Sequence, residues 1–228
     1  MIIAIDGPAG SGKGTVAKLL AKKLNFTHLD SGSFYRVVAF CVYDAQVDPA
    51  DPARVTALLP RLKIELRDTA RGQRVICGGR DLTDEIRFDL VSQIVPQISR
   101  IPRVRQWANA YIRRMAEGHD VVVEGRDMTT EVFPRAELKL FLDATLEERA
   151  RRRYLELKKK DGNATLAGIK ESIARRDHLD RARPRGALRI APDAIYIDST
   201  RLGPGAVVDF IIDKANRLNP GVKANKKP

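Results

Sequence analysis

The chain has 228 residues, which suffices for one compact domain or for a domain with inserted segments. Lys and Arg number 41 against 29 Asp and Glu, so the formal net charge of +12 favours an anionic partner, either a nucleic acid or a phosphorylated small molecule. Aromatic residues make up only 6%, too few for a base-stacking platform, and the motifs of common RNA- and DNA-binding modules are absent. We therefore assign most of the charge to nucleotide binding and the rest to a solvated tail, Lys223 to Lys227.

Neither a leader nor a long apolar run marks the chain for export or for a membrane. The N-terminus enters an apolar segment at once, and we expect a cytoplasmic protein that does not bind membranes. The two cysteines, Cys41 and Cys77, lack the spacing of metal ligands, and we expect buried thiols in a reducing compartment.

The strongest motif lies between an apolar run, Ile2–Ile5, and a helical pattern that starts at Val16. Strand, glycine-rich loop and helix are the context of a Walker A phosphate loop. Its backbone N–H groups and the helix N-terminus would cradle the phosphates of ATP, and Lys13 would reach the β- and γ-phosphates. The predicted ATP-binding residues are Gly7, Pro8, Ala9, Gly10, Ser11, Gly12, Lys13, Gly14 and Thr15.

The residue after the lysine departs from the usual motif. Gly14 stands where Ser or Thr is usual, and the hydroxyl comes one position later, at Thr15. A direct hydroxyl ligand for Mg²⁺ is therefore missing or displaced. The GKGT pattern resembles nucleoside monophosphate kinases, whose Mg²⁺ is held mainly by water and by the nucleotide.

The next segments predict a second strand and an inserted region. Phe26–Asp30 is expected as a strand, and the loop 30–33 opens a helix that carries Arg36, a candidate anion ligand. A break at 48–52 and a short helix at 53–59 follow. Alternating residues then predict a small β-meander over about 61–83, with Gly78-Gly79 as a hairpin turn. A helix from 84 towards 98 is expected to break at Pro96.

A buried strand at 121–123 is expected after a long helix at 103–117. It delivers Glu124, Arg126 and Asp127 to the sheet edge that carries the phosphate loop. A carboxylate after an apolar strand is the Walker B pattern, which orders Mg²⁺ and its waters. Glu124 and Thr15 are therefore possible outer-shell metal groups.

The last third predicts two basic helices around a polar turn. A strand at 138–142 is followed by a helix with an acidic first turn and a run of arginines that includes Arg152 and Arg153, and by a turn at 161–163. We interpret this region as a lid that closes over the transferred phosphoryl group. In the next helix, 165–183, Arg176, Asp180 and Arg183 fall on one face. A strand at 195–198, a helix at 207–218 and a disordered tail close the chain.

Several motifs together resemble those of bacterial cytidylate kinases over nearly the whole length. They are DGPAGSGKGT at 6–15, LDSGSFYR at 29–36, IPRVR at 101–105, EGRDM at 124–128 with VFP at 132–134, FLDA at 141–144 with ERARRR at 148–153, and RRDHLDRAR at 175–183. The GFPR-type motif of adenylate kinases and of eukaryotic UMP–CMP kinases is absent.

This resemblance implies an α/β fold of the P-loop nucleoside monophosphate kinase type. A parallel five-stranded core sheet flanked by helices would carry an inserted antiparallel sheet in the NMP-binding region, and a helical lid. We expect the core at 1–30, 101–148 and 184–219, the NMP-binding region at 31–100, the lid with its following helix at 149–183, and a disordered tail at 220–228.

The resemblance also implies transfer of a phosphoryl group from ATP to CMP or dCMP, with Mg²⁺, in pyrimidine nucleotide metabolism and by a monomer. Catalytic roles would fall to Lys13, Arg126, Arg152 and Arg153. The residues implied to bind CMP are Ser31, Arg36 and Arg126 around the phosphate, Arg105, Asp127 and Arg183 at the base, and Arg176 and Asp180 at the ribose.

The base assignment has a chemical argument of its own. Cytosine carries an N4 amino donor where uracil carries the O4 acceptor, so the Asp127 carboxylate favours cytosine. Arginine donors suit the O2 and N3 acceptors of the same ring. Leaving such polar groups unpaired with the wrong base can discriminate strongly.

Two positions depart from the family pattern, and two other functions stay open. Pro96 stands where a serine usually contacts the base, and Thr129 stands where a glycine usually follows GRDM or GRDI, so that this loop must avoid positive φ or accept strain. The alternatives are a nucleoside monophosphate kinase that prefers UMP or AMP and a nucleotide-gated RNA-binding protein.

Overall fold

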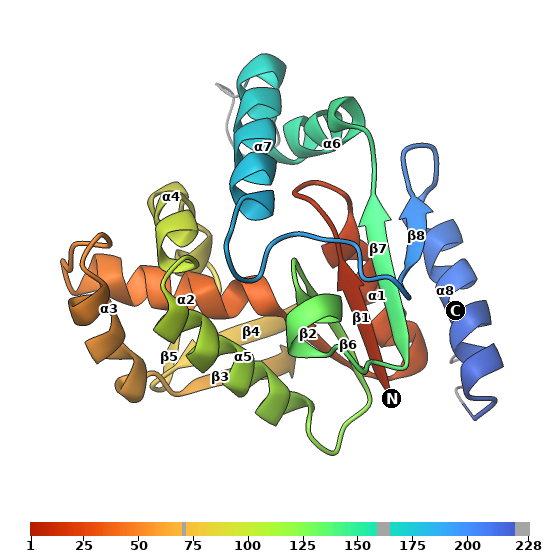
Figure 1. The fold of residues 1–228 in the computed structure, drawn as a ribbon, viewed down its shortest axis with the longest axis horizontal. Coiled ribbons are helices and arrows are strands. Elements are labelled where there is room, and N and C mark those ends of the chain that lie inside the picture. Colours follow the sequence, from red (N-terminus) through yellow and green to blue (C-terminus); the bar gives the residue numbers. More distant parts are fainter. Residues whose placement is uncertain (70–71, 159–164, 222–228) are drawn as a thin grey trace. The chain divides into compact units, whose positions relative to one another are not determined.

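A computed structural model describes residues 1–69, 72–158 and 165–221 of the chain (Figure 1). Two compact units are formed, one from 1–29 together with 113–228 and the other from 30–112. The expected turn of the β-meander, the polar turn of the lid and the basic tail lie partly or wholly outside the described residues. No described helix has both the length and the apolar character needed to cross a membrane.

The first unit is built around a five-stranded sheet with the order β2-β6-β1-β7-β8, which confirms the predicted core sheet. β1 runs parallel to both of its neighbours, β6 and β7, and β7 runs parallel to β8. The apolar runs of the central strands explain their position, because strands covered on both faces are apolar throughout. The bounds are β1 Ile2–Asp6, β2 Thr27–Asp30, β6 Val121–Gly125, β7 Leu138–Asp143 and β8 Ile195–Asp198.

Two pairs of helices accompany this sheet. The apolar residues of α1 (Lys13–Leu24) and α8 (Pro204–Leu218) share one buried cluster with Ile3, Ile5 and Leu140 of the sheet. The second pair, α6 (Leu146–Lys158) and α7 (Leu166–Arg181), has a small apolar cluster of its own. The two predicted helices of the lid region are therefore present, although the chain between them is not described.

The second unit combines helices with the small antiparallel sheet β3-β4-β5, which confirms the inserted β-meander. Gly78 and Gly79 join β4 to β5 with φ of 58° and 85°, the left-handed pair that a tight hairpin requires. The bounds are α2 Ser31–Asp44, α3 Pro52–Leu58, β3 Ile64–Thr69, β4 Gly72–Cys77, β5 Arg80–Asp81, α4 Asp89–Ile98 and α5 Pro102–Ala116.

The expected helix break at Pro96 is wrong, because Pro96 lies inside α4. A proline lacks one backbone N–H, and so close to the helix end this loss is small enough for packing to outweigh. The actual interruption comes at Phe88, between a short 3₁₀ turn and α4. Helix α2 also starts earlier than expected, at Ser31, because the Asp30 side chain caps it by accepting from Gly32 N at 2.8 Å.

The cysteines are half-buried rather than buried, and they lie together. Cys41 belongs to α2 and Cys77 to β4. A hydrogen bond between the thiols lowers the pKa of Cys77 to about 7 and raises the pKa of Cys41. No sequence motif indicates this contact, because it depends on where the inserted sheet packs in its unit.

Gly7 offers a test of how closely the phosphate loop approaches the sheet. A Cβ on Gly7 would lie 2.1 Å from the backbone oxygen of Leu142, in β7. We expect Gly7→Ala to lower the free energy of unfolding by about 2–3 kcal/mol in urea titrations, because backbone must move to relieve the contact. The control is Gly205→Ala in α8, where nothing lies within 4 Å. Equal stability of the two variants would contradict the close approach.

Candidate active site

The phosphate loop follows β1 and ends in α1, as predicted. Gly10 and Gly12 adopt φ of 77° and 87°, and Gly12 caps α1, whose first turn contains no acidic side chain. Ser11 is fully buried, and its hydroxyl finds no hydrogen-bond partner among the described residues. Lys13 Nζ donates to Pro8 O at 3.0 Å. A curled backbone, a helix N-terminus, an unsatisfied hydroxyl and an ammonium group are the features that favour an anion.

The Glu124 carboxylate lies close to the glycine after Lys13. A Cβ on Gly14 would lie 3.1 Å from Glu124 Oε1 and 3.3 Å from Oε2, so a side chain there would press on the carboxylate. Glu124 is buried at the end of β6 and lies 3.1 Å from His28 Nε2. Its carboxylate thus borders the loop where a serine or threonine is usual. Thr15 is exposed.

Three side chains predicted to bind CMP do meet in this unit. Arg126 Nε donates to Asp180 Oδ2 at 2.7 Å, and Arg183 Nη2 donates to Asp180 Oδ1 at 2.5 Å. Burial acts to raise the pKa of Asp180, but the charges of Arg126, Arg183 and Arg176 outweigh it and hold that pKa below its usual range. Asp127, directly after Arg126, is 2% exposed.

Arg183 reaches Asp180 in a different way from the one expected. We predicted a common helical face, but α7 ends at Arg181, and Arg183 contacts Asp180 from beyond the helix end. The prediction of proximity is right and its stated geometry is wrong. The chain must leave the helix before Arg183 because Pro184 follows, and a residue before proline disfavours the helical conformation.

A cavity of about 590 Å³ opens beside the phosphate loop. Gly10, Gly12 and Thr15 line it on the loop side, and the arginines of α6 line it on another. Arg152 connects the phosphate loop to the segment after β8, donating to Ser11 O at 3.2 Å and to Ser199 O at 2.6 Å. Arg153 pairs with Glu156 at 3.0 Å and is half exposed.

Part of this lining was missed by sequence reasoning. The segment 199–204, between β8 and α8, contributes Ser199, Thr200, Arg201, Leu202, Gly203 and Pro204. The rule that ligands bind beyond the carboxyl ends of parallel strands could have indicated it, because the segment directly follows β8.

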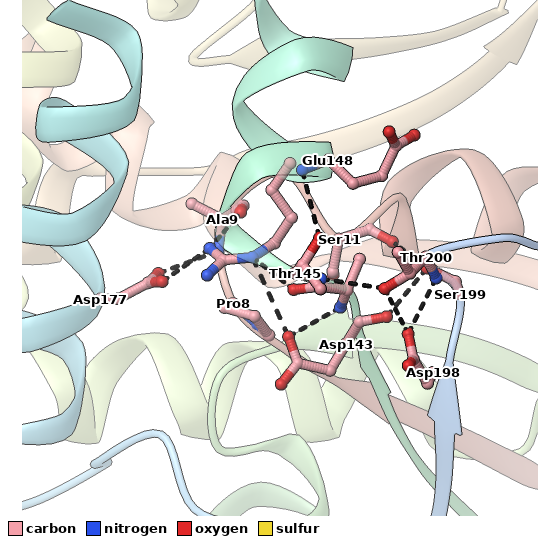
Figure 2. Close-up of polar contacts among 12 residues, drawn as sticks. Pro8, Ala9, Ser11, Asp143, Thr145, Glu148, Asp177, Asp198, Ser199 and Thr200 are labelled. Carbon is pink, nitrogen blue, oxygen red and sulfur yellow. Dashed lines mark hydrogen bonds and ion pairs between the residues drawn. The ribbon is translucent and has the colours of Figure 1, made fainter. Parts of the chain in front are cut away.

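A buried ion pair holds the phosphate loop from the side of α6 and α7 (Figure 2). Arg149 Nη1 donates to Asp177 Oδ2 at 2.6 Å and to Ala9 O at 3.0 Å, while Ala9 N donates to Asp177 Oδ1 at 3.4 Å. The backbone C=O and N–H of Ala9 are therefore both hydrogen-bonded to this one ion pair. Both side chains are nearly inaccessible, at 6% and 4%.

The remaining predicted CMP-binding residues belong to the unit 30–112. Ser31 is the buried first residue of α2, and Arg36 Nη1 lies 3.8 Å from Asp30 Oδ2. Arg105 is buried in α5, with its guanidinium 5.8 Å from the centre of the Tyr35 ring. Within this unit the structure thus gathers residues from α2 and α5, and their place opposite the phosphate loop stays a prediction.

Comparison with known proteins decides the family. The family model described as cytidylate kinase matches residues 3–217. This chain belongs to the cytidylate kinase family. It is 44% identical to a cytidylate kinase of Geobacillus kaustophilus over 94% of this chain and 96% of that protein. It is 42% identical to one from Pseudomonas aeruginosa, with 95% of each chain covered.

A solved structure shares the fold at low sequence identity. The crystal structure of an uncharacterised protein from Eubacterium ventriosum matches 95% of this chain and 98% of its own, with a TM-score of 0.51 and 14% identity. At that identity the likeness concerns the fold alone. Family membership thus comes from sequence, and for this member of the cytidylate kinase family the arrangement of individual side chains comes from the structure.

The Arg149–Asp177 pair is testable by a double-mutant cycle on the free energy of unfolding. We expect Asp177→Ala to cost about 3–5 kcal/mol, because it leaves a buried guanidinium without its counter-ion. The cycle with Arg149→Met should give a coupling energy of about 1–3 kcal/mol. The control is Arg175→Ala, which removes an exposed pair with Glu171 and should cost below about 1 kcal/mol. An Asp177→Ala cost no larger than the control would contradict the burial of the pair.

Proposed function

We propose that the protein transfers the γ-phosphoryl group of ATP to CMP or dCMP, giving ADP and CDP or dCDP. The observation that carries this proposal is that two functional loops follow adjacent parallel strands of one sheet. The phosphate loop follows β1, and Arg126 and Asp127 follow β6, the strand that pairs with β1 in the register Asp6 to Gly125. Family membership supports the cytidine substrate.

ATP would bind with its phosphates in the loop and its nucleoside in the adjoining cavity. Ser11, Lys13 and the N-terminus of α1 provide donors for phosphate oxygens. The cavity has the volume of a small-molecule site, and the segment 199–204 provides backbone and hydroxyl groups beside it. Arg152 lies between the loop and this segment, and Arg153 lines the same cavity, so both can approach the transferred group.

Mg²⁺ would be held mainly by the nucleotide. The fit rests on Glu124, whose carboxylate borders the loop at Gly14, and Mg²⁺ is usually bound by one or two carboxylates together with phosphates and water. Within the described residues, no group of three or more His, Cys, Asp or Glu side chains could hold a metal ion. When bound, Mg²⁺ neutralises charge on the phosphates. Glu124, with Thr15, the residue after Gly14, would order its waters.

The acceptor would be recognised by charge and by hydrogen-bond polarity. Arg126, Ser31 and Arg36 are proposed to hold its phosphate, and Arg176 with Asp180 its ribose. Asp180 already accepts from two arginines, yet each carboxylate oxygen has a second lone pair for a ribose hydroxyl. Asp127, Arg105 and Arg183 would read the base, the carboxylate accepting from N4 and the guanidinium groups donating to O2 and N3.

Catalysis would come from positioning and charge neutralisation. A phosphate monoester oxygen is already anionic, so the acceptor needs no strong base. Lys13, Arg126, Arg152 and Arg153 would neutralise the charge of the transferring group during a direct in-line transfer with no covalent intermediate. Closure of the α6–α7 region would exclude water and so limit hydrolysis of ATP. We place this monomeric enzyme in the cytoplasm.

The direct test is an acceptor screen of CMP, dCMP, UMP and AMP with ATP and Mg²⁺, measured as ADP formation. We expect CMP and dCMP to be preferred over UMP, and Asp127→Asn to narrow that preference about tenfold or more, because an amide can also donate to the O4 of uracil. Lys13→Ala is the control for turnover that depends on the phosphate loop. No ADP formation above the acceptor-free rate would contradict the proposal, and an unchanged ratio in Asp127→Asn would remove Asp127 from base recognition.

A further inference from the structure

Asp6 is a fully buried carboxylate that the reaction outlined above does not use. It is the last residue of β1 and is 0% exposed. Because β1 pairs with β6 in the register Asp6 to Gly125, its side chain lies beside the loop that follows β6. A charge in this position is costly unless hydrogen bonds compensate for lost water.

Three donors compensate, and all belong to two consecutive residues. Met128 N donates to Asp6 Oδ1 at 2.9 Å, and Thr129 N donates to Oδ2 at 2.7 Å. The Thr129 hydroxyl donates to the same Oδ2 at 2.6 Å. Burial raises the pKa of Asp6, and these bonds from Thr129 and Met128 offset part of that rise. In all three of these hydrogen bonds the Asp6 carboxylate is the acceptor.

The residues held in this way directly follow Arg126 and Asp127. Met128 begins a short π-helical turn, Met128–Val132, which closes back on Asp127 O through Glu131 N at 2.9 Å. Arg126 is held on the other side by Asp180. The segment proposed to contact the acceptor is therefore fixed at both of its ends by buried carboxylates.

The hydroxyl is specific to the threonine at position 129. A glycine at 129 could supply the backbone N–H but not the hydroxyl. Thr129 is not among the described residues with positive φ, so the threonine is accommodated without the strain that a glycine position can imply. It is also 1% exposed, which makes its bond to Asp6 inaccessible to water.

We propose that the Thr129 hydroxyl, through Asp6, is a positioning group that fixes Arg126 and Asp127 for recognition of the cytidine acceptor. Thr129 and Asp6 do not contact the reacting atoms. The hydroxyl acts by holding the backbone on which the reading side chains stand, and its loss lets that backbone sample other positions. The roles of Arg126 and Asp127 in this inference rest on the proposed function.

The experiment compares two matched pairs, each differing in the hydroxyl. Thr129→Val replaces the hydroxyl by a methyl group of nearly equal size, and Thr129→Ala removes the hydroxyl that Thr129→Ser keeps. We expect Val and Ala to raise the KM for CMP and to narrow the CMP/UMP ratio of kcat/KM by roughly five- to tenfold, which is the scale of one typical intramolecular hydrogen bond. Ser should stay close to wild type. The KM for ATP should remain unchanged in all four proteins.

Hydrogen exchange of the segment 125–132, in the protein without nucleotides, gives a readout independent of the reaction. Exchange should be faster in Val and Ala than in wild type and Ser. Thermal unfolding identifies a variant that fails to fold, and the Ser/Ala pair then decides alone.

Two results would overturn the inference. One is a loss of thermal stability in Val and Ala with unchanged exchange, KM and base preference. The other is a Ser variant as impaired as Ala, which would assign the effect to packing of the methyl group. A wild-type protein that phosphorylates no CMP would refute the proposed function instead, and the exchange comparison would still decide whether the hydroxyl fixes the loop.

Discussion

The parallel pairing of β1 with β6 and β7 is the constraint on which the rest of the first unit depends. Asp6 lies opposite Gly125 on one side and opposite Phe141 on the other. Three strands therefore end at the same edge of the sheet. The phosphate loop follows the first, Arg126 and Asp127 follow the second, and the start of α6 follows the third. A shift in this register would separate all of these groups together.

Buried charges hold the loops that emerge from this edge. Asp6 holds the loop after β6, Glu124 borders Gly14, and the Arg149–Asp177 pair engages Ala9 through its N–H and its C=O. Burying a charge costs several kcal/mol, which good geometry and further hydrogen bonds can offset. The loop backbone is then fixed before substrate binds, so less conformational entropy is lost on binding. We infer that the Arg149–Asp177 pair helps the glycine-rich phosphate loop to keep a defined shape.

Much of this architecture follows from local signals. The apolar strands, the glycine loop and the hairpin at Gly78-Gly79 each have a period or a backbone requirement that a sequence displays. The family resemblance was likewise carried by contiguous motifs. The break expected at Pro96 failed because a local rule about proline was outweighed by the packing of α4 near its end.

What escaped prediction depends on partners distant in sequence. Arg149 stands in a basic run, and its guanidinium is buried because it pairs with Asp177, 28 residues away on α7. The hydrogen bond from Thr129 to Asp6 joins residues 123 positions apart, so the motif around Asp6 did not indicate it. The cavity lining from segment 199–204 and the contact between Cys41 and Cys77 likewise depend on residues that are distant in sequence. Only the packed chain brings these groups together.

The central claim is that donor and acceptor meet at this single edge for direct transfer. It is tested most directly with a bisubstrate compound in which cytidine and adenosine are joined through their 5′ positions by five phosphates. The account predicts that this compound inhibits competitively against both ATP and CMP, and binds more tightly than either substrate. Competition with ATP alone, with the kinetics of CMP unaffected, would contradict it.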